Sequence, residues 1–421
     1  MQKKLLAVAV AGALGAPAIA LAQTSTVQVF GTIYMEYARI KQGTGQVAGA
    51  ANLNRQSVDM LQTPGSEIGF KGEEKLGGGL SAWFQCASTA DVRGQSQDGW
   101  CSRNSAIGLK GGFGNVYIGN WDTPFKRTIS PTNVGGNDTG VFGTANLLTA
   151  GSTTVFGNAG PANFKRRQNN MIMYDSPDFG GFQVMAGYTA INNATATSTG
   201  AANRKPRVMS LGGQYSAGPL YVSAGFERHK DFLAAQQPAG VFPTADPPVG
   251  ATVGSAAGTR EGDADGWHVG AAYTWGPVRF GGQYTRQKFD NVTALGAAAD
   301  TRVSAYTVGV DWTIVGPHGL RAAYTRANDV KGTPGALAVG GTQGQARPAV
   351  PAAGAANNTG ARQWQVRYVY TLSKRTEFTA GYVNLRNEAA ATYDIFGVSA
   401  ATAGSPGNHE NAYALGIRHT F

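Results

Sequence analysis

The sequence predicts an all-β fold, a 16-stranded antiparallel transmembrane β-barrel, from three observations. Sixteen segments alternate apolar and polar residues, the connections between them alternate between short and long, and the chain begins with an export leader. After residue 22 no run approaches the about 18–20 apolar residues that a spanning helix needs. A membrane form of this chain must therefore pair its backbone groups within a closed barrel.

The first 22 residues have the pattern of a cleaved secretory signal peptide. Lys3 and Lys4 precede an apolar run over 5–14, and 20–22 supplies small residues before a cleavage site. The run is too short to span a bilayer, and an uncleaved anchor is the alternative. We expect an exported chain with a mature barrel domain over 23–421.

The composition agrees with a barrel that has a wet interior. Charged residues make up 14% of the chain, against about 25% in typical soluble proteins, and 60 of 421 residues are glycine. The formal net charge is +10, and removing the two lysines of the leader leaves +8. A basic balance fits nucleic acid, an anionic membrane surface or a pore for anions. The basic residues are scattered singly along an exported chain, so we expect no nucleic acid.

Period-two alternation between turn residues defines the expected strands. The first eight are 27–39, 65–72, 79–88, 101–111, 115–121, 167–175, 181–191 and 206–216. The second eight are 219–230, 265–275, 277–288, 301–314, 319–328, 362–372, 376–387 and 411–421. A barrel of about this size is too wide for its own side chains to fill, so it holds water.

The connections between these strands alternate in length along the whole chain. The short ones are 74–78, 112–114, 176–180, 217–218, 276, 316–318 and 373–375. The long ones are 40–64, 89–100, 122–166, 192–205, 231–264, 289–300, 329–361 and 388–410. Tight turns at one end and long loops at the other are typical of outer-membrane barrels, and an even count places both termini at the periplasmic end. A soluble sandwich or propeller does not require this alternation.

The two faces can be followed along the first and last strands. Outward positions of the first strand are Val27, Val29, Gly31, Ile33, Met35 and Tyr37, and lumenal positions are Gln28, Thr32, Tyr34 and Glu36. The last strand ends on the aromatic Phe421, which suits a membrane interface, although this strand alone fits a soluble sandwich equally well. Aromatic pairs near other strand ends favour the barrel: Tyr273/Trp275, Phe280/Tyr284, Tyr306/Trp312 and Tyr413/Phe421.

The only two cysteines, Cys86 and Cys101, flank a loop between two expected strands. Export places them in an oxidising compartment, so we expect a disulfide that ties the base of a hairpin loop. A metal site would need further ligands nearby, and the sequence around the cysteines supplies none. Calcium loops and phosphate loops are also missing from the sequence, so we expect no cofactor.

By these features the chain resembles the general diffusion porins of Gram-negative outer membranes, and most closely their β-proteobacterial branch. The stretches that carry the resemblance are VQVFGTIY, EIGFKGEEKLGGGLSAWFQ, IGLKGGFGNVYIGNWDTP, RRQNNMIMYDSPDFGGFQ, YTLSKRTEF and GIRHTF. They follow the family's order and cover essentially the whole mature chain.

The resemblance implies a homotrimer whose third extracellular loop, 122–166, folds into the pore as a constriction. It also implies that arginines on the barrel wall face acidic residues on that loop, and charges of this kind set ion preference. The matching positions are Arg103 and Arg167 on the wall and Asp138 on the loop.

The chain departs from the family pattern at two lumenal positions. Glu67 stands where the family usually has an arginine, and Thr32 stands where many relatives have a lysine. Further charged candidates on the loop are Asp122, Lys126, Arg127, Lys165 and Arg166. For Arg103, parity with Ile107 and Leu109 points the side chain outward, whereas the resemblance points it inward, and we follow the resemblance.

These features predict a passive outer-membrane channel for ions and small hydrophilic solutes, with a weak anion preference. The alternative is a substrate-specific channel for organic acids, phosphate or sugars, in which Tyr34 or Tyr117 would contact the solute. An outer-membrane enzyme is not expected, because none of the five histidines stands in a recognisable arrangement with Ser and Asp. Expected partners are outer-membrane lipid, lipopolysaccharide and the barrel-assembly machinery, since the family's C-terminal aromatic strand, here ending on Phe421, is an assembly signal.

Overall fold

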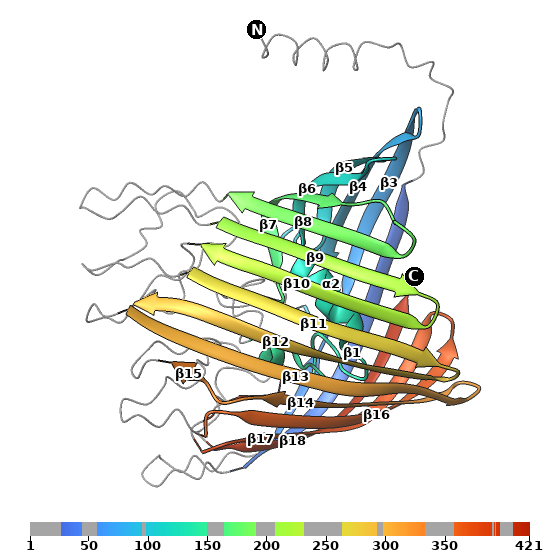
Figure 1. Cartoon of the computed structure of the whole chain (residues 1–421). Coiled ribbons are helices and arrows are strands. Elements are labelled where there is room, and N and C mark those ends of the chain that lie inside the picture. The colour runs from blue at the N-terminus through green and yellow to red at the C-terminus, as the bar shows by residue number, and fades with distance from the viewer. Residues whose placement is uncertain are drawn as a thin grey trace.

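The computed structural model is a β-barrel whose strands run obliquely around a central space (Figure 1). It describes residues 27–43, 57–94, 98–149, 164–190, 207–230, 263–292, 298–332, 358–389, 391, 393–395 and 407–421. The predicted leader over 1–22 lies outside the described residues. Within the described ranges, no helix is long and apolar enough to cross a membrane.

The strands agree closely with the segments that alternation predicts. In the first half they are β1 (Gln28–Gln42), β2 (Val58–Gln62), β3 (Glu67–Gly77), β4 (Leu80–Thr89), β5 (Ser105–Gly111), β6 (Gly114–Asp122), β7 (Arg167–Asp175), β8 (Phe182–Ala190) and β9 (Arg207–Ala217). In the second half they are β10 (Leu220–Lys230), β11 (Asp263–Trp275), β12 (Val278–Val292), β13 (Ala298–Val315), β14 (His318–Ala327), β15 (Lys331–Gly332), β16 (Ala361–Ser373), β17 (Thr376–Asn387) and β18 (His409–Thr420).

The sheet closes on itself through antiparallel pairing of β1 with β18, from Thr32 opposite Thr420 to Gln42 opposite Glu410. On its other side β1 pairs with both β2 and β3, which together form one crossing of the barrel. β15 is a two-residue strand beside β13. The 18 strands therefore make a closed barrel of 16 crossings, as the sequence predicts.

Sequence reasoning missed β2 because a turn interrupts this crossing. Pro64 and Gly65, the latter with φ of 70°, lie between β2 and β3 and mark a loop in the sequence. β5 is shorter than the expected strand over 101–111, because Cys101 has φ of 55° and the extended backbone begins only at Ser105. These corrections leave the number of crossings unchanged.

The faces alternate as expected. The outward face is apolar: Val29 of β1 is 56% exposed and Trp275 of β11 is 72% exposed. The lumenal alternates of β1, Tyr34 and Glu36, are buried. Exposed aromatic side chains lie near both ends of the strands, which is the arrangement of residues at membrane interfaces.

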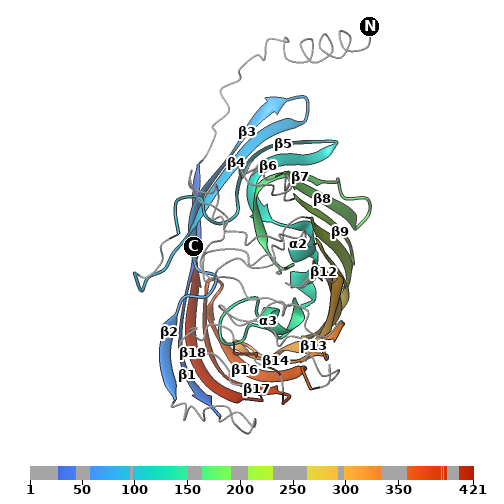
Figure 2. The ribbon, with the colours of Figure 1, turned by 90° about the vertical axis from the view of Figure 1, so that its left-hand side faces the viewer.

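The described part of loop 122–166 forms three short helices: α2 (Pro124–Ile129), η1 (Ser130–Thr132) and α3 (Ala145–Leu148). α2 and η1 contact β8 to β12, and α3 contacts β13 and β14. Viewed along the barrel, α2 and α3 lie inside the ring of strands (Figure 2). Among the described residues, a large apolar cluster lies where this loop meets the wall, and it includes Phe142, Leu147 and Leu148.

Candidate functional site

Loop 122–166 packs against a row of lumen-facing glycines in the barrel wall. The contacts are Gly212 with Thr128, Gly270 with Thr132, Gly281 with Val134 and Gly381 with Phe142. A Cβ atom at any of these four glycines would overlap the loop residue that faces it. The wall is therefore recessed where the loop lies, and larger side chains there would push the loop into the lumen.

Polar side chains of the wall bind the backbone of the same loop. The Val141 N–H donates to Oε1 of Glu36 at 2.8 Å, and the Gly135 N–H donates to Oδ1 of Asp311 at 2.9 Å. Gln365 Nε2 donates to the Gly135 carbonyl at 3.2 Å. Sequence reasoning missed Asp311, Gln365 and the wall glycines as site residues. The sequence pattern that could have identified them is the recurrence of glycines and amide side chains at lumenal positions of consecutive strands.

Where β6 leads into the loop, charged side chains form two neighbouring groups that act on one another electrostatically. Arg103 Nε donates to Oε2 of Glu67 at 2.7 Å. Lys126 Nζ lies 2.8 Å from Oδ1 of Asp122, and Arg167 Nη2 lies 3.4 Å from the same oxygen. We refer to Glu67, Arg103, Asp122, Lys126 and Arg167 as the entrance cluster. Each arginine of the cluster is paired with a carboxylate on the same side of the lumen: Arg103 with Glu67, and Arg167 with Asp122.

The position of Arg103 explains why the parity of β5 and the family resemblance disagreed. Ile107 and Leu109 are 60% and 45% exposed on the outward face, as parity predicts. Arg103 precedes β5, and therefore parity counted from Ile107 does not apply to it. Its side chain reaches Glu67, which lies on the face of β3 opposite to the outward Ile68.

Asn104 joins Asp122 to Arg167 within the entrance cluster. Arg167 Nε donates to Oδ1 of Asn104 at 2.7 Å, and Asn104 Nδ2 donates to Oδ2 of Asp122 at 3.2 Å. The Asp122 N–H in turn donates to Oδ1 of Asn104 at 3.0 Å. This amide fixes the carboxylate and the guanidinium relative to one another.

Other predicted site residues lie away from the entrance cluster. Asp138 contacts Lys165 and accepts from the Ser130 hydroxyl at 2.8 Å, so its partners belong to the loop itself. Burial alone would raise the pKa of Asp138, but the Lys165 ammonium and the Ser130 hydroxyl more than offset this and lower it. Arg166 is buried and donates to Oε1 of Gln168 at 2.5 Å.

Thr32 lies on β1 opposite Glu67, and on its other side it faces β18. Its hydroxyl is 3.2 Å from the Thr420 hydroxyl. The structure therefore places Thr32 beside the entrance cluster, where a lysine would have added a positive charge.

A second charged group, whose members are not among the predicted site residues, lines the wall formed by β14, β16, β17 and β18. Arg321 Nη2 is 3.5 Å and Arg418 Nη1 is 4.0 Å from the Glu377 carboxylate. Arg367 lies over the Phe142 ring, with 4.9 Å from its guanidinium carbon to the ring centroid. Arg321 of β14 lies directly opposite Arg367 of β16, and Arg418 of β18 lies directly opposite Glu377 of β17.

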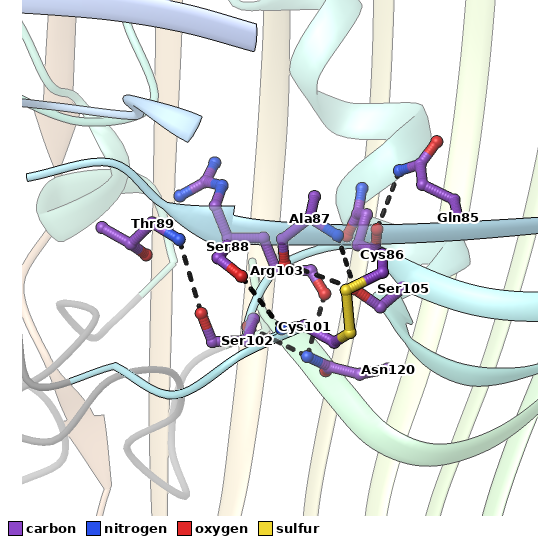
Figure 3. Close-up of a disulfide and its surroundings, with 11 residues drawn as sticks. Gln85, Cys86, Ala87, Ser88, Thr89, Cys101, Ser102, Arg103, Ser105 and Asn120 are labelled. Carbon is purple, nitrogen blue, oxygen red and sulfur yellow. Dashed lines mark hydrogen bonds between the residues drawn. A yellow bond between two sulfur atoms is a disulfide. The ribbon is translucent and has the colours of Figure 1, made fainter. Parts of the chain in front are cut away.

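The predicted disulfide is present between Cys86 and Cys101 (Figure 3). Two hydrogen bonds adjoin it: the Cys101 N–H donates to the Ser88 side chain Oγ at 3.0 Å, and the Arg103 N–H donates to the Ala87 backbone carbonyl at 2.9 Å. The disulfide thus holds the segment that carries Arg103 against β4.

Three aromatic side chains meet on the lumenal side of β4 and β6. The ring centroids of Trp83, Tyr117 and Trp121 are 5.3–5.7 Å apart. Arg127 Nη1 donates to the Tyr117 hydroxyl at 2.8 Å and to Oδ1 of Asp175 at 2.6 Å. Tyr117 is buried against Met171 and Met173, so Trp83 and Trp121 are the partly exposed rings of this group, beside a paired guanidinium. In the ranges that the structure describes, no group of three or more His, Cys, Asp or Glu side chains could hold a metal ion.

The chain was compared with models of known protein families. The family described as Gram-negative porin matches residues 6–390, in agreement with the barrel architecture. The chain belongs to the Gram-negative porin family. This porin is similar to outer membrane porin protein 32 of Delftia acidovorans, with 26% identity over 427 residues and all of both chains covered. It is also 31% identical over 229 residues to the major outer membrane protein P.IB of Neisseria gonorrhoeae, covering 54% of this chain and 55% of that protein.

Among solved structures, the porin's fold matches that of the anion-selective porin from Comamonas acidovorans. The TM-score is 0.66 at 24% identity, covering 94% of this chain and 100% of that one. Proteins of this family are outer-membrane channels, so the predictions of a channel rather than an enzyme, and of a β-proteobacterial type of porin, are confirmed.

Proposed function

We propose that this porin conducts ions and small hydrophilic solutes passively through a constriction formed by loop 122–166 and the entrance cluster, with a weak preference for anions. No chemistry is required of the protein. Selection depends on the width of the lumen and on the charges that line it.

The observation that carries this proposal is the composition of the entrance cluster at the start of the inserted loop. It contains three cations, Arg103, Lys126 and Arg167, and two carboxylates, Glu67 and Asp122. One positive charge is in excess. Because Glu67 neutralises a guanidinium that would otherwise face the lumen, the expected preference for anions is weak.

Two further observations support the same sign of selectivity. The second wall group adds Arg321 and Arg418 beside the Glu377 carboxylate, and Arg367, which lies in the field of both Glu377 and Glu36. The similar porin from Comamonas acidovorans is described as anion-selective.

Planar-bilayer recording of the purified protein tests this proposal. We expect stepwise, ohmic conductance, and a reversal potential in a potassium chloride gradient whose sign indicates a modest excess of chloride permeability. A reversal potential of cation-selective sign would contradict the proposed role of the entrance cluster. Absence of conductance from correctly folded protein would contradict the channel itself.

The alternative of a solute-specific channel has one observation in its favour, which is the group of Trp83, Tyr117 and Trp121 beside Arg127. Aromatic faces bind sugar rings and other flat solutes, and a guanidinium adds affinity for an anionic group. Current block that saturates with one class of sugar or organic acid would favour this alternative over general diffusion.

For the assembled state we infer a homotrimer in the outer membrane, inserted by the barrel-assembly machinery and surrounded by lipid and lipopolysaccharide. Membership in an outer-membrane porin family supports this inference. Crosslinking of the native protein followed by denaturing electrophoresis tests it, with a trimer as the expected product and a monomer alone as the contrary result.

A further inference from the structure

Two indole rings face the lumen between the entrance cluster and the periplasmic turns. They belong to Trp83 of β4 and Trp121 of β6, and both are only partly buried. Phe84, the neighbour of Trp83 along β4, is 40% exposed on the outward face, so Trp83 points the opposite way, into the lumen. Trp121 directly precedes Asp122 of the entrance cluster. The two rings therefore follow the entrance cluster on the way to the periplasmic end of the lumen.

The wall holds the Trp83 indole in one position. Its Nε1 donates to Oδ1 of Asn115 at 2.7 Å, and its ring centroid is 5.4 Å from that of Tyr117 and 5.7 Å from that of Trp121. A Cβ at Gly108 of β5 would lie 2.8 Å from the same Nε1, so the indole uses space that a larger residue at position 108 would fill. The exposed part of the ring is thus a preorganised surface for a flat group.

Closer to the periplasmic turns, the lumenal positions of β3 and β5 carry three lysines around one carboxylate. The lysines are Lys71, Lys75 and Lys110, and Glu73 contacts the ammonium groups of Lys75 and Lys110. We refer to these four residues as the lysine group. Two positive charges are in excess, so an anion that leaves the entrance cluster meets a second region of positive charge in the lumen.

The strand register places the lysine group beside Trp83, in the part of the wall where β3 to β6 lie side by side (Figure 2). Glu73 stands directly opposite Trp83. Lys75 and Lys110 both stand opposite Ser81, the next lumenal residue of β4 toward the periplasmic turn. Diagonal neighbours on one face of a sheet are about 7–8 Å apart, which long side chains span. The two ammonium groups can therefore reach a carboxylate attached to a ring that lies on Trp83.

The hydrogen-bonding groups next to the rings are engaged with one another, and this bears on the class of solute. Nε1 of Trp83 is bound to Asn115, and the Tyr117 hydroxyl accepts from Arg127 at 2.8 Å. Arg127 is itself paired with Asp175 at 2.6 Å. Binding of a sugar depends on hydrogen bonds to its many hydroxyls, whereas an aromatic ring needs only the face of another ring. The surroundings of Trp83 therefore favour an aromatic solute over a sugar.

The lysine group favours a solute that also carries a negative charge. An ammonium has three N–H donors, so Lys110 can bind a second carboxylate while it contacts Glu73. A carboxylate bonded directly to an aromatic ring places both features in one small, rigid molecule, which loses little conformational freedom on binding.

We propose that the lumen of this porin binds aromatic carboxylates on the periplasmic side of the entrance cluster, with the ring stacked on Trp83 and the carboxylate held by Lys110 and Lys75. Trp121 provides the ring contact that precedes this site. The inference rests on the proposed function, because the solute reaches the site through the conducting lumen, and it adds a chemical class of solute that the channel selects. Binding at such a site must be weak enough for the solute to leave again.

The test uses the full-length protein in planar bilayers, with sodium benzoate as the probe. Sodium cyclohexanecarboxylate is the matched solute, since it has the same charge and a similar size but no aromatic face. We expect benzoate to reduce the chloride current saturably, and cyclohexanecarboxylate to need about fivefold higher concentration for half of the effect. Glucose should not reduce the current saturably.

Substitutions locate the effect. The site variants are Trp83→Leu and Lys110→Gln, and their matched controls are Trp312→Leu, on the outward face of β13, and Lys374→Gln, in an exposed periplasmic turn. We expect the half-saturating concentration of benzoate to rise about tenfold for Trp83→Leu and about fivefold for Lys110→Gln. The controls should match wild type, whereas Trp83→Phe and Lys110→Arg should retain most of the binding. Heat-modifiable migration on gels checks that each variant is folded.

Three results would contradict the proposal: equal effects of benzoate and cyclohexanecarboxylate, equal half-saturating concentrations in site variants and controls, or saturable block by glucose at lower concentration than by benzoate. Saturation-transfer NMR with the protein in detergent measures benzoate binding without conduction. If the porin conducts with anion-selective sign but benzoate does not bind, only this inference fails. If benzoate binds as expected but the channel is cation-selective, only the proposed ion preference fails.

Discussion

Arg103 and Glu67 form an ion pair, with Nε donating to Oε2 at 2.7 Å, and this pair places a wall carboxylate beside a wall arginine. Both side chains are partly exposed, at 22% and 30%. A guanidinium with an adjacent carboxylate creates less potential in the lumen than an isolated one, since the two fields largely cancel beyond a few ångströms. The residue at position 67 therefore sets how strongly Arg103 acts on passing ions.

Replacing Glu67 should consequently shift selectivity toward anions. For Glu67→Gln we expect the ratio of chloride to potassium permeability to rise by about twofold, and for Glu67→Arg by more, because a fourth cation is then added to the entrance cluster. Reversal potentials in a salt gradient measure both. The control is Asp59→Asn, which removes a carboxylate paired with the Tyr37 hydroxyl on the outward face. An unchanged reversal potential in the Glu67 variants would show that this side chain does not act on the ion path.

The disulfide should determine how well Arg103 is positioned. Cys86 and Cys101 are 15 residues apart, and a crosslink over a segment of that length stabilises a fold by about 3 kcal/mol in the chain-entropy description. We expect Cys86→Ser/Cys101→Ser to lower the temperature at which the barrel unfolds and to weaken the anion preference, because residues 101–104 gain freedom.

Heat-modifiable migration and reversal potentials measure these two effects. Reduced wild-type protein provides the matched comparison, since it lacks the bond but keeps both side chains. Equal stability in oxidised and reduced protein would contradict a structural role for the bond.

How far the sequence predicts this structure depends on whether a feature is local. Strand positions follow from period-two alternation between turn residues, and β7, expected over 167–175, is observed from Arg167 to Asp175. The path of loop 122–166 is not local, because it depends on glycines such as Gly212 and Gly281 that are distant in sequence and resemble turn residues. The partner of Arg103 could not be predicted for the same reason: Glu67 is 36 residues away, and the intervening backbone leaves the regular strand.

The recessed wall predicts that adjacent glycines of β9 have opposite sensitivities. A Cβ at Gly212 would lie 2.8 Å from Cγ2 of Thr128 and 2.9 Å from the Pro124 carbonyl oxygen, whereas a Cβ at Gly213 meets nothing within 4 Å. We expect Gly212→Val to displace α2 and change single-channel conductance by about 1.5- to 2-fold, because the loop occupies the lumen.

Gly213→Val is the control, since it adds the same side chain to the same strand on the outward face. It should conduct like wild type, and both variants should keep the heat-modifiable migration of a folded barrel. If Gly212→Val also conducts like wild type, the start of the loop does not limit the ion path.

Phe421 should govern assembly more than conduction, because it completes the seam of the barrel. Its N–H donates to the Gly31 carbonyl at 3.0 Å and its own carbonyl accepts from the Gly31 N–H at 3.1 Å. The ring covers Gly31 so closely that a Cβ there would lie 2.5 Å from Cζ of Phe421. Phe421→Ala keeps the backbone bonds and loses the ring, whereas deletion of Phe421 loses both.

We therefore expect the amount of folded barrel in outer-membrane fractions to fall by about threefold for Phe421→Ala and further for the deletion, since closure of the sheet pairs its last edge. The barrels that do form should show wild-type single-channel conductance, because Phe421 lies outside the lumen. Phe113→Ala, which truncates an exposed aromatic in a periplasmic turn, is the control and should assemble normally. Normal assembly of the deletion variant would contradict this role. It would mean that the remaining β1–β18 pairs, from Thr32 with Thr420 to Gln42 with Glu410, are sufficient to close the barrel.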